Sequence, residues 1–196
     1  MRFYTKEWYE LMQHQHDAWY MRVSSGKKYT DSDYQLQQEE DKKTQKAVQK
    51  IVKAADEELS RQQIPERIKS IFCFHDNDLL SFQKQGNTYE MLLQKEYGWS
   101  EEEQKEGITP YIKIIFTEGV LLEQEAMLRL KTKIDEDGDL DTNCIYLYDE
   151  LYSVPGGYEV HMLFYILEEQ ERLAYLTIRC SDIHFEDNIT LPKAET

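Results

Sequence analysis

The residues most suggestive of chemistry form an acidic run from Lys133 to Asn143, "KIDEDGDLDTN". Aspartates occupy every second position of its central part: Asp135, Asp137, Asp139 and Asp141. Alternating oxygen ligands, a glycine for a sharp turn and a closing glutamate are what a helix–loop–helix calcium site requires. The spacing therefore raises a calcium loop as a first hypothesis.

Neither register of this run completes such a loop. With Gly138 at the turn position, Lys133 takes the first ligand position and Cys144 takes the place of the closing glutamate. With Asp135 as the first ligand, Leu140 falls on the turn position and Tyr146 on the closing one. The flanking segments are also rich in β-forming residues. We favour a solvated β-hairpin connection, in which Asp-Gly supplies the turn, and we expect no metal.

A second candidate is the polar cluster "HDND", which follows the apolar "IFCF". A pair such as His75 and Asp76 can bind a metal or transfer a proton. Adjacent residues of a strand point to opposite faces, so the two can act together only if the chain turns here. Asp76 and Asn77 are typical turn residues, and we favour a turn, with His75 and Asp76 kept as candidate binding residues.

A third candidate lies on two β-like segments, "CIYLYDELYSV" and "YEVHMLFYIL". Strand alternation places Tyr146, Tyr148 and Glu150 on one face of the first segment. His161 shares a face of the second with Glu159. Together these side chains could line a polar, aromatic concavity for a small ligand. The alternative, which we favour, is an ordinary solvent face with cross-strand Tyr–Tyr and Glu–His pairs.

Motifs that usually mark catalysis are absent from the sequence. It contains no G-x-G-x-x-G, P-loop, H-E-x-x-H, G-x-S-x-G or cysteine-nucleophile pattern. This weakens the hypothesis of an enzyme and leaves it open. We expect no catalytic residue and no cofactor.

The elements that would position these candidates change character near residue 70. Before it, Thr5 can cap a first helix whose apolar face includes Trp8, Leu11 and Trp19, and we expect both tryptophans to be buried. A second helix, capped by Asp31, Ser32 or Asp33, runs to about Gln63 and ends before Pro65. Its apolar stripe is confined to the C-terminal half.

After residue 70 the hydrophobic period becomes two, which is typical of strands. We expect a hairpin at Gln85–Asn87 and further strands over 111–119, 126–134, 144–154, 158–167 and 172–185. The fold class is α+β, with N-terminal helices packed on a C-terminal antiparallel meander of about seven strands, a strongly curved sheet or partly closed barrel. The expected regions are 1–69 (helical), 70–187 (β-rich) and 188–196 (tail), within one integrated domain.

The charge is distributed unevenly along the chain. Residues 1–70 hold 13 Lys and Arg against 12 Asp and Glu, whereas residues 71–196 hold 10 against 26, for a net charge of −15. An acidic surface repels nucleic-acid phosphates and anionic membranes, so we expect neither as a partner. It permits solubility, a basic protein partner or cation binding.

The remaining composition indicates a cytoplasmic protein. No run of 18 apolar residues is present, and the start of the chain has no apolar segment of the kind that marks secretion signals. The three cysteines are odd in number and show no metal-binding spacing, which fits free thiols in a reducing compartment. The oligomeric state does not follow from these features.

The opening "MRFYTKEWYELMQ" resembles the start of a bacterial protein family of about this length that is known only as a domain of unknown function. Its members open with Met, a basic residue, two aromatics and "TKEWY". They continue with a helical segment, an "HD" turn, a "Y-x-E-L" strand and a closing "DI", which correspond here to His75-Asp76, Tyr148–Leu151 and Asp182-Ile183. The "HD" and "DI" pieces recur in many small β-rich bacterial proteins, including immunity proteins that neutralise toxins. The resemblance implies a bacterial, cytoplasmic protein and supplies no activity.

Two hypotheses about function follow. The first is a non-catalytic cytoplasmic binding protein or immunity-type inhibitor, whose acidic β surface meets a basic protein partner. The second is an enzyme or small-ligand-binding protein with a site on the Glu150/His161 face. A deep pocket beneath that face would favour the second hypothesis, and a flat or convex acidic face would favour the first.

We predict that the run from Asp135 to Asp141 does not bind calcium, because neither register supplies both the turn and the bidentate ligand. Calorimetric titration with calcium is expected to give no binding heat at micromolar concentrations. Micromolar binding that disappears in Asp137→Ala would contradict this prediction.

Overall fold

The computed structural model describes residues 1–13, 30–69, 72, 74–94, 111–134, 140–167 and 172–189. The chain forms two compact units, Met1–Arg61 and Gln62–Thr196. We call them the helical unit and the sheet unit. The boundary between them lies a few residues before the change of pattern at residue 70.

The helical unit begins with a helix over residues 6–13. The Thr5 hydroxyl accepts a hydrogen bond from the backbone N–H of Trp8 at 3.2 Å, as the predicted cap requires. Trp8 is buried, as predicted, and its ring meets Tyr4 edge-on with centroids 5.0 Å apart. Leu11 on the same predicted face is 46% exposed, so the apolar stripe is only partly buried. Trp19 lies outside the described residues.

The long helix α2 spans Asp31–Arg61 and ends just before Pro65, as predicted. Thr30 precedes it, and the Thr30 carbonyl accepts a hydrogen bond from the N–H of Tyr34 at 3.2 Å. The apolar stripe in its C-terminal half is half-buried or buried, with Ala55 9% exposed, while most described side chains of its N-terminal half are exposed. Arg2 and Glu58 form an ion pair at 3.5 Å, which joins the start of the chain to α2.

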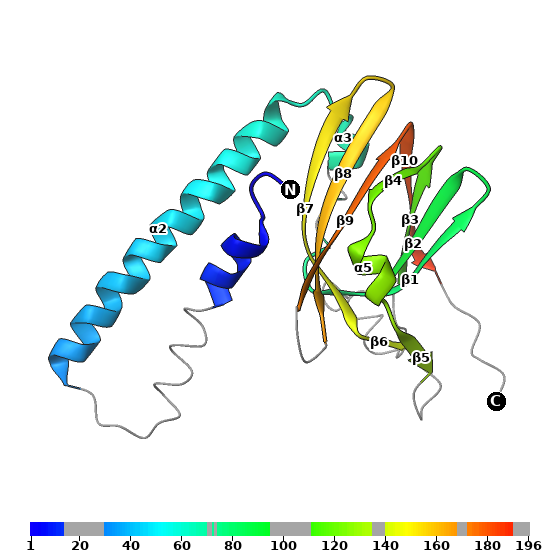
Figure 1. Ribbon diagram of the computed structural model, residues 1–196. Coiled ribbons are helices and arrows are strands. Elements are labelled where there is room, and N and C mark those ends of the chain that lie inside the picture. Colours follow the sequence, from blue (N-terminus) through cyan, green and yellow to red (C-terminus); the bar gives the residue numbers. More distant parts are fainter. Residues whose placement is uncertain are drawn as a thin grey trace. The chain divides into compact units, whose positions relative to one another are not determined.

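The sheet unit is built on an antiparallel sheet of eight strands in the order β10-β3-β2-β1-β7-β8-β9-β4 (Figure 1). The strands are β1 (Asn77–Gln85), β2 (Thr88–Gln94), β3 (Tyr111–Thr117), β4 (Val120–Glu123), β7 (Cys144–Val154), β8 (Gly157–Ile166), β9 (Leu173–Cys180) and β10 (Asp182–Ile189). A separate hairpin pairs β5 (Thr132–Ile134) with β6 (Leu140–Thr142). The predicted α+β class with an antiparallel sheet is confirmed.

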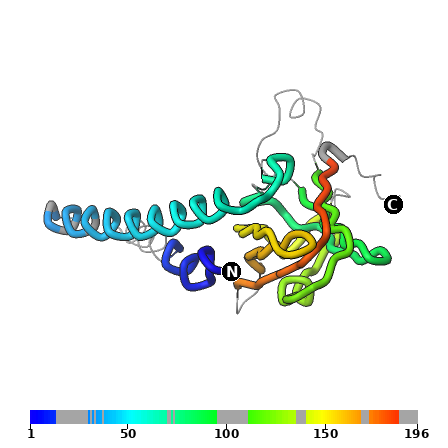
Figure 2. Tube along the Cα trace, turned by 90° about the horizontal axis from the view of Figure 1, so that it is seen from above, coloured from blue at the N-terminus to red at the C-terminus, as the bar shows by residue number. Residues whose placement is uncertain are grey.

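Two bends bring the ends of this sheet together. Only Ser181 separates β9 from β10, and only Glu118 and Gly119 separate β3 from β4. Yet β10 pairs with β3, whereas β9 pairs with β4 at the other end of the strand order. The Ser181 N–H donates to the Thr117 carbonyl at 2.9 Å and ties the two bends to each other. The sheet is therefore strongly curved. It is not a closed barrel, because β10 and β4 stand at the two ends of the strand order and do not pair with each other. The continuous run of β9 into β10 can be followed in Figure 2.

One predicted strand is partly wrong. The segment 126–134 forms the short helix α5 (Glu125–Arg129) followed by β5. Its apolar residues also fit one helical turn, and short apolar runs do not separate the two structures. The Glu125 carboxylate accepts a hydrogen bond from the backbone N–H of Tyr175 at 3.2 Å, which anchors α5 on β9.

The core consists of alternate residues that point into the curved sheet. Fully buried members include Met91, Leu93, Ile114, Phe116, Met162, Phe164, Leu176 and Ile178. Helix α3 (Glu66–Lys69) is attached to β10, since Arg67 donates to the Ile183 carbonyl at 2.9 Å and to the Asp182 carboxylate at 2.5 Å. Partial burial alone would raise the pKa of Asp182, but these bonds and the N–H of Ile183 lower it.

No helix in the described ranges is long and apolar enough to cross a membrane. Cys144 and Cys180 are buried free thiols, and burial raises the pKa of each to about 12. A thiol with so high a pKa carries almost no reactive thiolate at neutral pH.

Gly157 sits where β8 passes closest to the β9–β10 bend. A Cβ atom there would lie 2.0 Å from the carbonyl oxygen of Cys180. We expect Gly157→Ala to destabilise the protein by about 1–3 kcal/mol or more, because backbone must move to relieve the overlap. Chemical denaturation followed by circular dichroism measures the change.

Gly86 provides the control. Its φ of +61° favours glycine, but a Cβ atom at this position would have no neighbour within 4 Å. Gly86→Ala should lose only about 1–2 kcal/mol from the left-handed conformation. Equal losses for the two substitutions would show that the contact at Cys180 does not constrain the bend.

Candidate functional site

His75 and Asp76 lie in a turn that enters β1. Asp76 has a φ of +65°, and its N–H donates to the carbonyl of Tyr146 at 2.8 Å. The turn brings the two neighbouring side chains together, with His75 Nδ1 2.5 Å from Asp76 Oδ2. The ring of His75 also meets Tyr148 edge-on, with centroids 4.6 Å apart. Three of the six candidate residues are therefore close to one another.

A β-bulge changes the predicted face of β7. The register with β8 shifts between Tyr146 and Tyr148, so Leu147 is the extra residue. A bulge interrupts strand alternation, which moves Tyr146 to the side opposite Tyr148 and Glu150. Tyr146 is fully buried and contacts Phe74 and Phe164, with ring centroids 5.6 and 5.0 Å away. The expectation that Tyr146 lines a shared face with Tyr148, Glu150 and His161 is therefore wrong.

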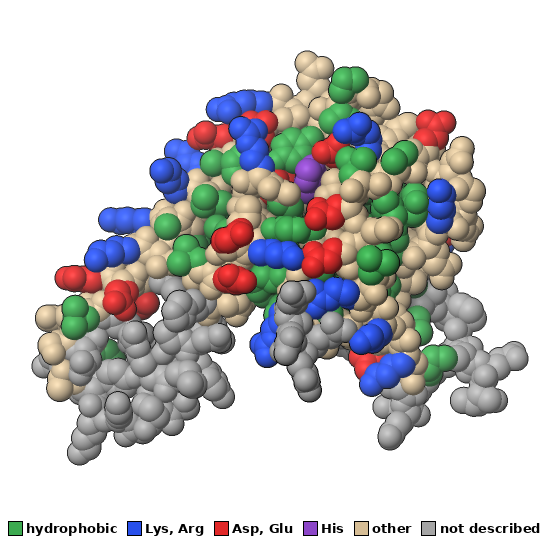
Figure 3. Space-filling view, in the orientation of Figure 1, with side chains coloured by type: hydrophobic (Ala, Val, Ile, Leu, Met, Phe, Trp, Pro, Cys, Tyr) green, Lys and Arg blue, Asp and Glu red, His purple; other side chains and the backbone are tan. Residues whose placement is uncertain are grey.

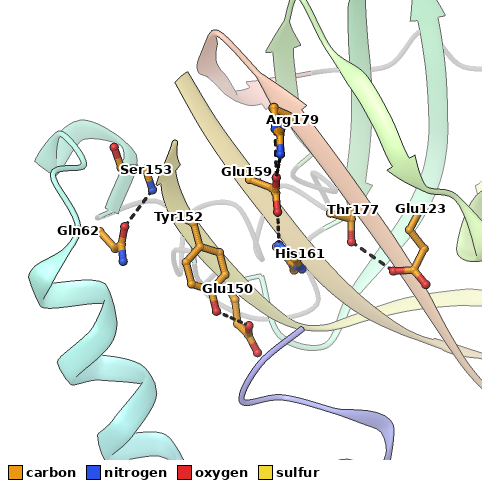
Figure 4. A network of polar contacts seen from close by, with 9 residues as sticks. All are labelled: Gln62, Glu123, Glu150, Tyr152, Ser153, Glu159, His161, Thr177 and Arg179. Atoms are coloured by element: carbon orange, nitrogen blue, oxygen red, sulfur yellow. Dashed lines mark hydrogen bonds and ion pairs between the residues drawn. The ribbon is translucent and has the colours of Figure 1, made fainter. Parts of the chain in front are cut away.

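Glu150 and His161 are direct cross-strand partners, as strand alternation suggested. Each is bound to a neighbour on its own strand, as Figure 4 shows. The hydroxyl of Tyr152 donates to Glu150 Oε2 at 2.7 Å, and Glu150 is only 6% exposed. His161 Nε2 lies 2.8 Å from Glu159 Oε1. The ring of Tyr152 meets that of His161 edge-on at 5.2 Å, which links the two pairs.

Glu159 is the centre of this arrangement. Arg179 on β9 donates to Glu159 Oε2 through Nη2 at 2.6 Å and through Nε at 3.1 Å, while His161 contacts the other oxygen (Figure 4). Partial burial alone would raise the pKa of Glu159, but the bonds from Arg179 and His161 outweigh it and lower the pKa. The carboxylate is thus ionised and held in place, which suits a structural ion pair better than a proton acceptor.

Two further hydrogen bonds extend the same polar network. Thr177 donates to Glu123 Oε2 at 3.3 Å, and the N–H of Ser153 donates to Gln62 Oε1 at 3.1 Å. The face shown in Figure 3 likewise has acidic and basic side chains interspersed with apolar ones. On this face charges of both signs are therefore mixed, and the carboxylates of the network are held by named partners.

Asp149 was not singled out by the sequence, because a single acid within a strand gives no signal before the bulge is known. Beyond Leu147 it follows the inward alternation, opposite the buried Met162. The residue as a whole is half-buried, yet burial of its carboxyl, only partly offset by the hydroxyl of Tyr146, raises its pKa to about 7. Asp149 is therefore the most perturbed carboxyl in the described part of the chain for which a pKa is resolved.

A second feature missed from the sequence is an open cleft of about 620 Å³ in the sheet unit. Its walls come from β1, β2 and the β5–β6 hairpin: Leu80, Ser81, Phe82, Gln83, Leu92, Leu130, Thr132, Lys133, Ile134 and Leu140. The lining is mainly apolar, and the volume falls in the range of ligand-binding clefts. It shares no residue with the polar network.

Within the described residues, no group of three or more His, Cys, Asp or Glu side chains is arranged to hold a metal ion. Comparisons with protein-family models, with curated proteins and with solved structures find no match to this chain. The resemblance to the family that opens with "TKEWY" stays a prediction.

The raised pKa of Asp149 predicts a specific dependence of stability on pH. Between about pH 4, where an unfolded aspartate ionises, and about pH 7, the folded protein keeps a proton that the unfolded chain has lost. Rising pH therefore lowers the free energy of unfolding in this window. The difference in stability between Asp149→Asn and the wild type should grow from pH 4 to 7 and then level off, as measured by denaturation at each pH.

Glu186→Gln provides a control at an exposed carboxyl. Its side chain is 54% exposed, so this variant measures the effect of removing one exposed carboxyl from the sheet unit. A flat profile for Asp149→Asn would mean that this carboxyl is hydrated in the folded protein.

Proposed function

We propose that this protein is a non-catalytic binding protein, of the kind that immunity-type inhibitors represent, and that its sheet unit meets a basic protein partner. The observation that carries the proposal is the match between charge and architecture. The sheet unit (62–196) holds 12 Lys and Arg against 27 Asp and Glu, whereas the helical unit (1–61) holds 11 of each. The whole net charge of −15 therefore belongs to one compact unit.

The concentration of negative charge in one unit favours a role in recognising a partner over a role in solubility alone. An acidic surface on one unit attracts a basic partner over roughly 10 Å at 0.1 M salt and orients its approach. It also disfavours nucleic acids and anionic membranes. A bacterial source and a cytoplasmic location belong to the same proposal, and they rest on the resemblance and on the unpaired, buried thiols of Cys144 and Cys180.

The state of the polar network supports a binding role. The Glu159 carboxylate is already paired with Arg179 and in contact with His161, and Glu150 accepts a hydrogen bond from Tyr152. Groups committed to such bonds stabilise the sheet and are poorly placed to take up a proton from a substrate.

One observation favours a small-ligand site on the Glu150/His161 face as the second candidate function. His161 Nδ1 is buried and has no hydrogen-bond partner among the described residues. A ligand with a donor or acceptor could satisfy it. A small molecule that raises the melting temperature of the wild type, but not that of His161→Ala, would favour this alternative.

The proposed function is tested with a partner captured by crosslinking from the source cell and then purified. Its association with the protein is followed by stopped-flow fluorescence across a salt series. We expect the on-rate to fall steeply with salt, because exposed charges that steer association are screened. An on-rate that does not depend on salt would contradict the proposal.

Matched triple variants locate the charges that matter. Glu118→Gln, Asp141→Asn and Glu186→Gln remove three exposed charges from the sheet unit, and Glu39→Gln, Asp41→Asn and Glu57→Gln remove three from the helical unit. We expect the first triple to slow association several-fold at low salt and the second to have little effect. Equal effects of the two triple variants on the association rate would mean that the acidic residues serve solubility and not recognition of the partner.

A further inference from the structure

The cleft in the sheet unit follows the edge of a strand. Four consecutive residues of β1, Leu80–Gln83, and three of β5, Thr132–Ile134, line it. Successive side chains of a strand point to opposite faces, so a cleft that touches every residue in turn must run along the backbone edge. The cleft therefore lies between the edge of β1 and the edge of β5.

Among the described residues, the edge of β1 that faces away from β2 has no strand partner along most of its length. β1 pairs with β7 only at Asn77 and Asp78, while its pairing with β2 continues to Gln85. Between the two walls of the cleft, the Thr132 hydroxyl donates to the Leu80 carbonyl at 2.7 Å. No hydrogen bond is present from this edge of β1, beyond Leu80, to another described residue.

Strand geometry identifies the backbone groups that remain. The carbonyl of Leu80 points to the open edge, and backbone groups of every second residue point to the same edge. Phe82 and Lys84 thus present their N–H and C=O groups there. Their neighbours Ser81 and Gln83 face β2, opposite Leu92 and Glu90. Unpaired edges of this type accept an extended chain as an added strand.

The side chains and charges around the cleft restrict what can occupy it. Leu92 of β2 and Ile134 and Leu140 of the hairpin offer apolar contacts to alternate side chains of an added strand. Ile134 is 56% exposed. Lys133 of β5 is already paired with Asp141 at 3.0 Å, so this pair adds no net charge to the cleft.

We propose that a basic partner binds by adding an extended segment, with alternating apolar and basic side chains, to the edge of β1 at Phe82 and Lys84. This inference rests on the proposed function and names the mode of recognition. Main-chain hydrogen bonds to β1 supply affinity, the apolar wall selects one set of side chains, and the net negative charge of the sheet unit favours basic residues between them. The β1 residues in the cleft, Leu80–Gln83, span about 13 Å, enough for roughly four residues of an added strand.

The probe for this mode is a blocked eight-residue peptide of alternating valine and lysine. Its control has the same sequence and charge but carries N-methyl groups on alternate residues, which removes the main-chain donors. Binding is followed by ¹⁵N–¹H spectra and by amide hydrogen exchange in isotope-labelled protein. We expect exchange at Phe82 and Lys84 to slow at least ten-fold with the peptide and to stay unchanged with the control.

Two variants at one position isolate the backbone donor. Lys84→Pro removes the N–H that points to the open edge of β1 and breaks no bond to β2, and proline is tolerated at such an edge. Lys84→Ala removes the same charge and keeps the N–H. We expect Lys84→Ala to bind the peptide at least as well as the wild type and Lys84→Pro to lose most binding. Ile134→Ser should weaken binding, whereas Leu128→Ser, an exposed leucine outside the cleft, should not.

Several results would overturn the proposal. These are absence of binding, equal binding of the N-methylated control, or binding that leaves exchange at Phe82 and Lys84 unchanged. Slow exchange of the two amides without peptide would mean that something else already pairs with the edge. If the protection grows with protein concentration, the edge is paired with a second copy of the chain. If it does not, the edge is paired with another segment of the same chain. If the captured partner shows salt-dependent association while these amides are unaffected by it, the proposed function stands and strand addition fails.

Discussion

Strands β1 and β7 pair over only two residues, Asn77 with Tyr146 and Asp78 with Ile145, and both candidate surfaces depend on this short contact. Each strand carries a bulge near this contact, at Leu80 in β1 and at Leu147 in β7, and the two bulges lie towards opposite ends of it. Bulges bend a strand and increase its twist. Because β7 begins at Cys144, it offers β1 no partner beyond Asp78, which leaves the edge of β1 without a strand partner among the described residues. The bulge at Leu147 causes the change of face that buries Tyr146 and brings Glu150 opposite His161.

The electrostatic organisation of the protein works at two ranges. At short range, charges are satisfied by named partners, as Glu159 is by Arg179 and Asp182 is by Arg67. At long range, the excess of 27 acidic over 12 basic residues in the sheet unit remains and creates a field that these pairs do not cancel. Local pairs stabilise the sheet, whereas the net field acts on molecules that approach it. Recognition by charge is therefore compatible with a polar network whose carboxylates, Glu150 and Glu159, are held by hydrogen bonds.

The sequence predicted the fold more successfully than the candidate site. Hydrophobic period and turn residues placed α2, the β1–β2 hairpin and the long strands β7, β8 and β9, because those signals are local. The prediction of a strand in the segment after Glu125 was wrong, because one helical turn and a short strand share the same apolar pattern. The prediction of which β7 side chains share a face was wrong from Leu147 onward. A bulge forms there through the pairing with β8, and it moves every later side chain to the opposite face. The bends that connect β3 to β4 and β9 to β10 depend on contacts distant in sequence, which no local pattern encodes.

The claim on which the account depends most is that the edge of β1 is open in the free protein. Amide hydrogen exchange at single-residue resolution tests it directly, without any partner. Ser81 and Gln83, which face β2, should exchange slowly, while Phe82 and Lys84 should exchange at rates close to those of an unprotected chain. Slow exchange at all four residues would contradict the account, because it would mean that the edge is already paired.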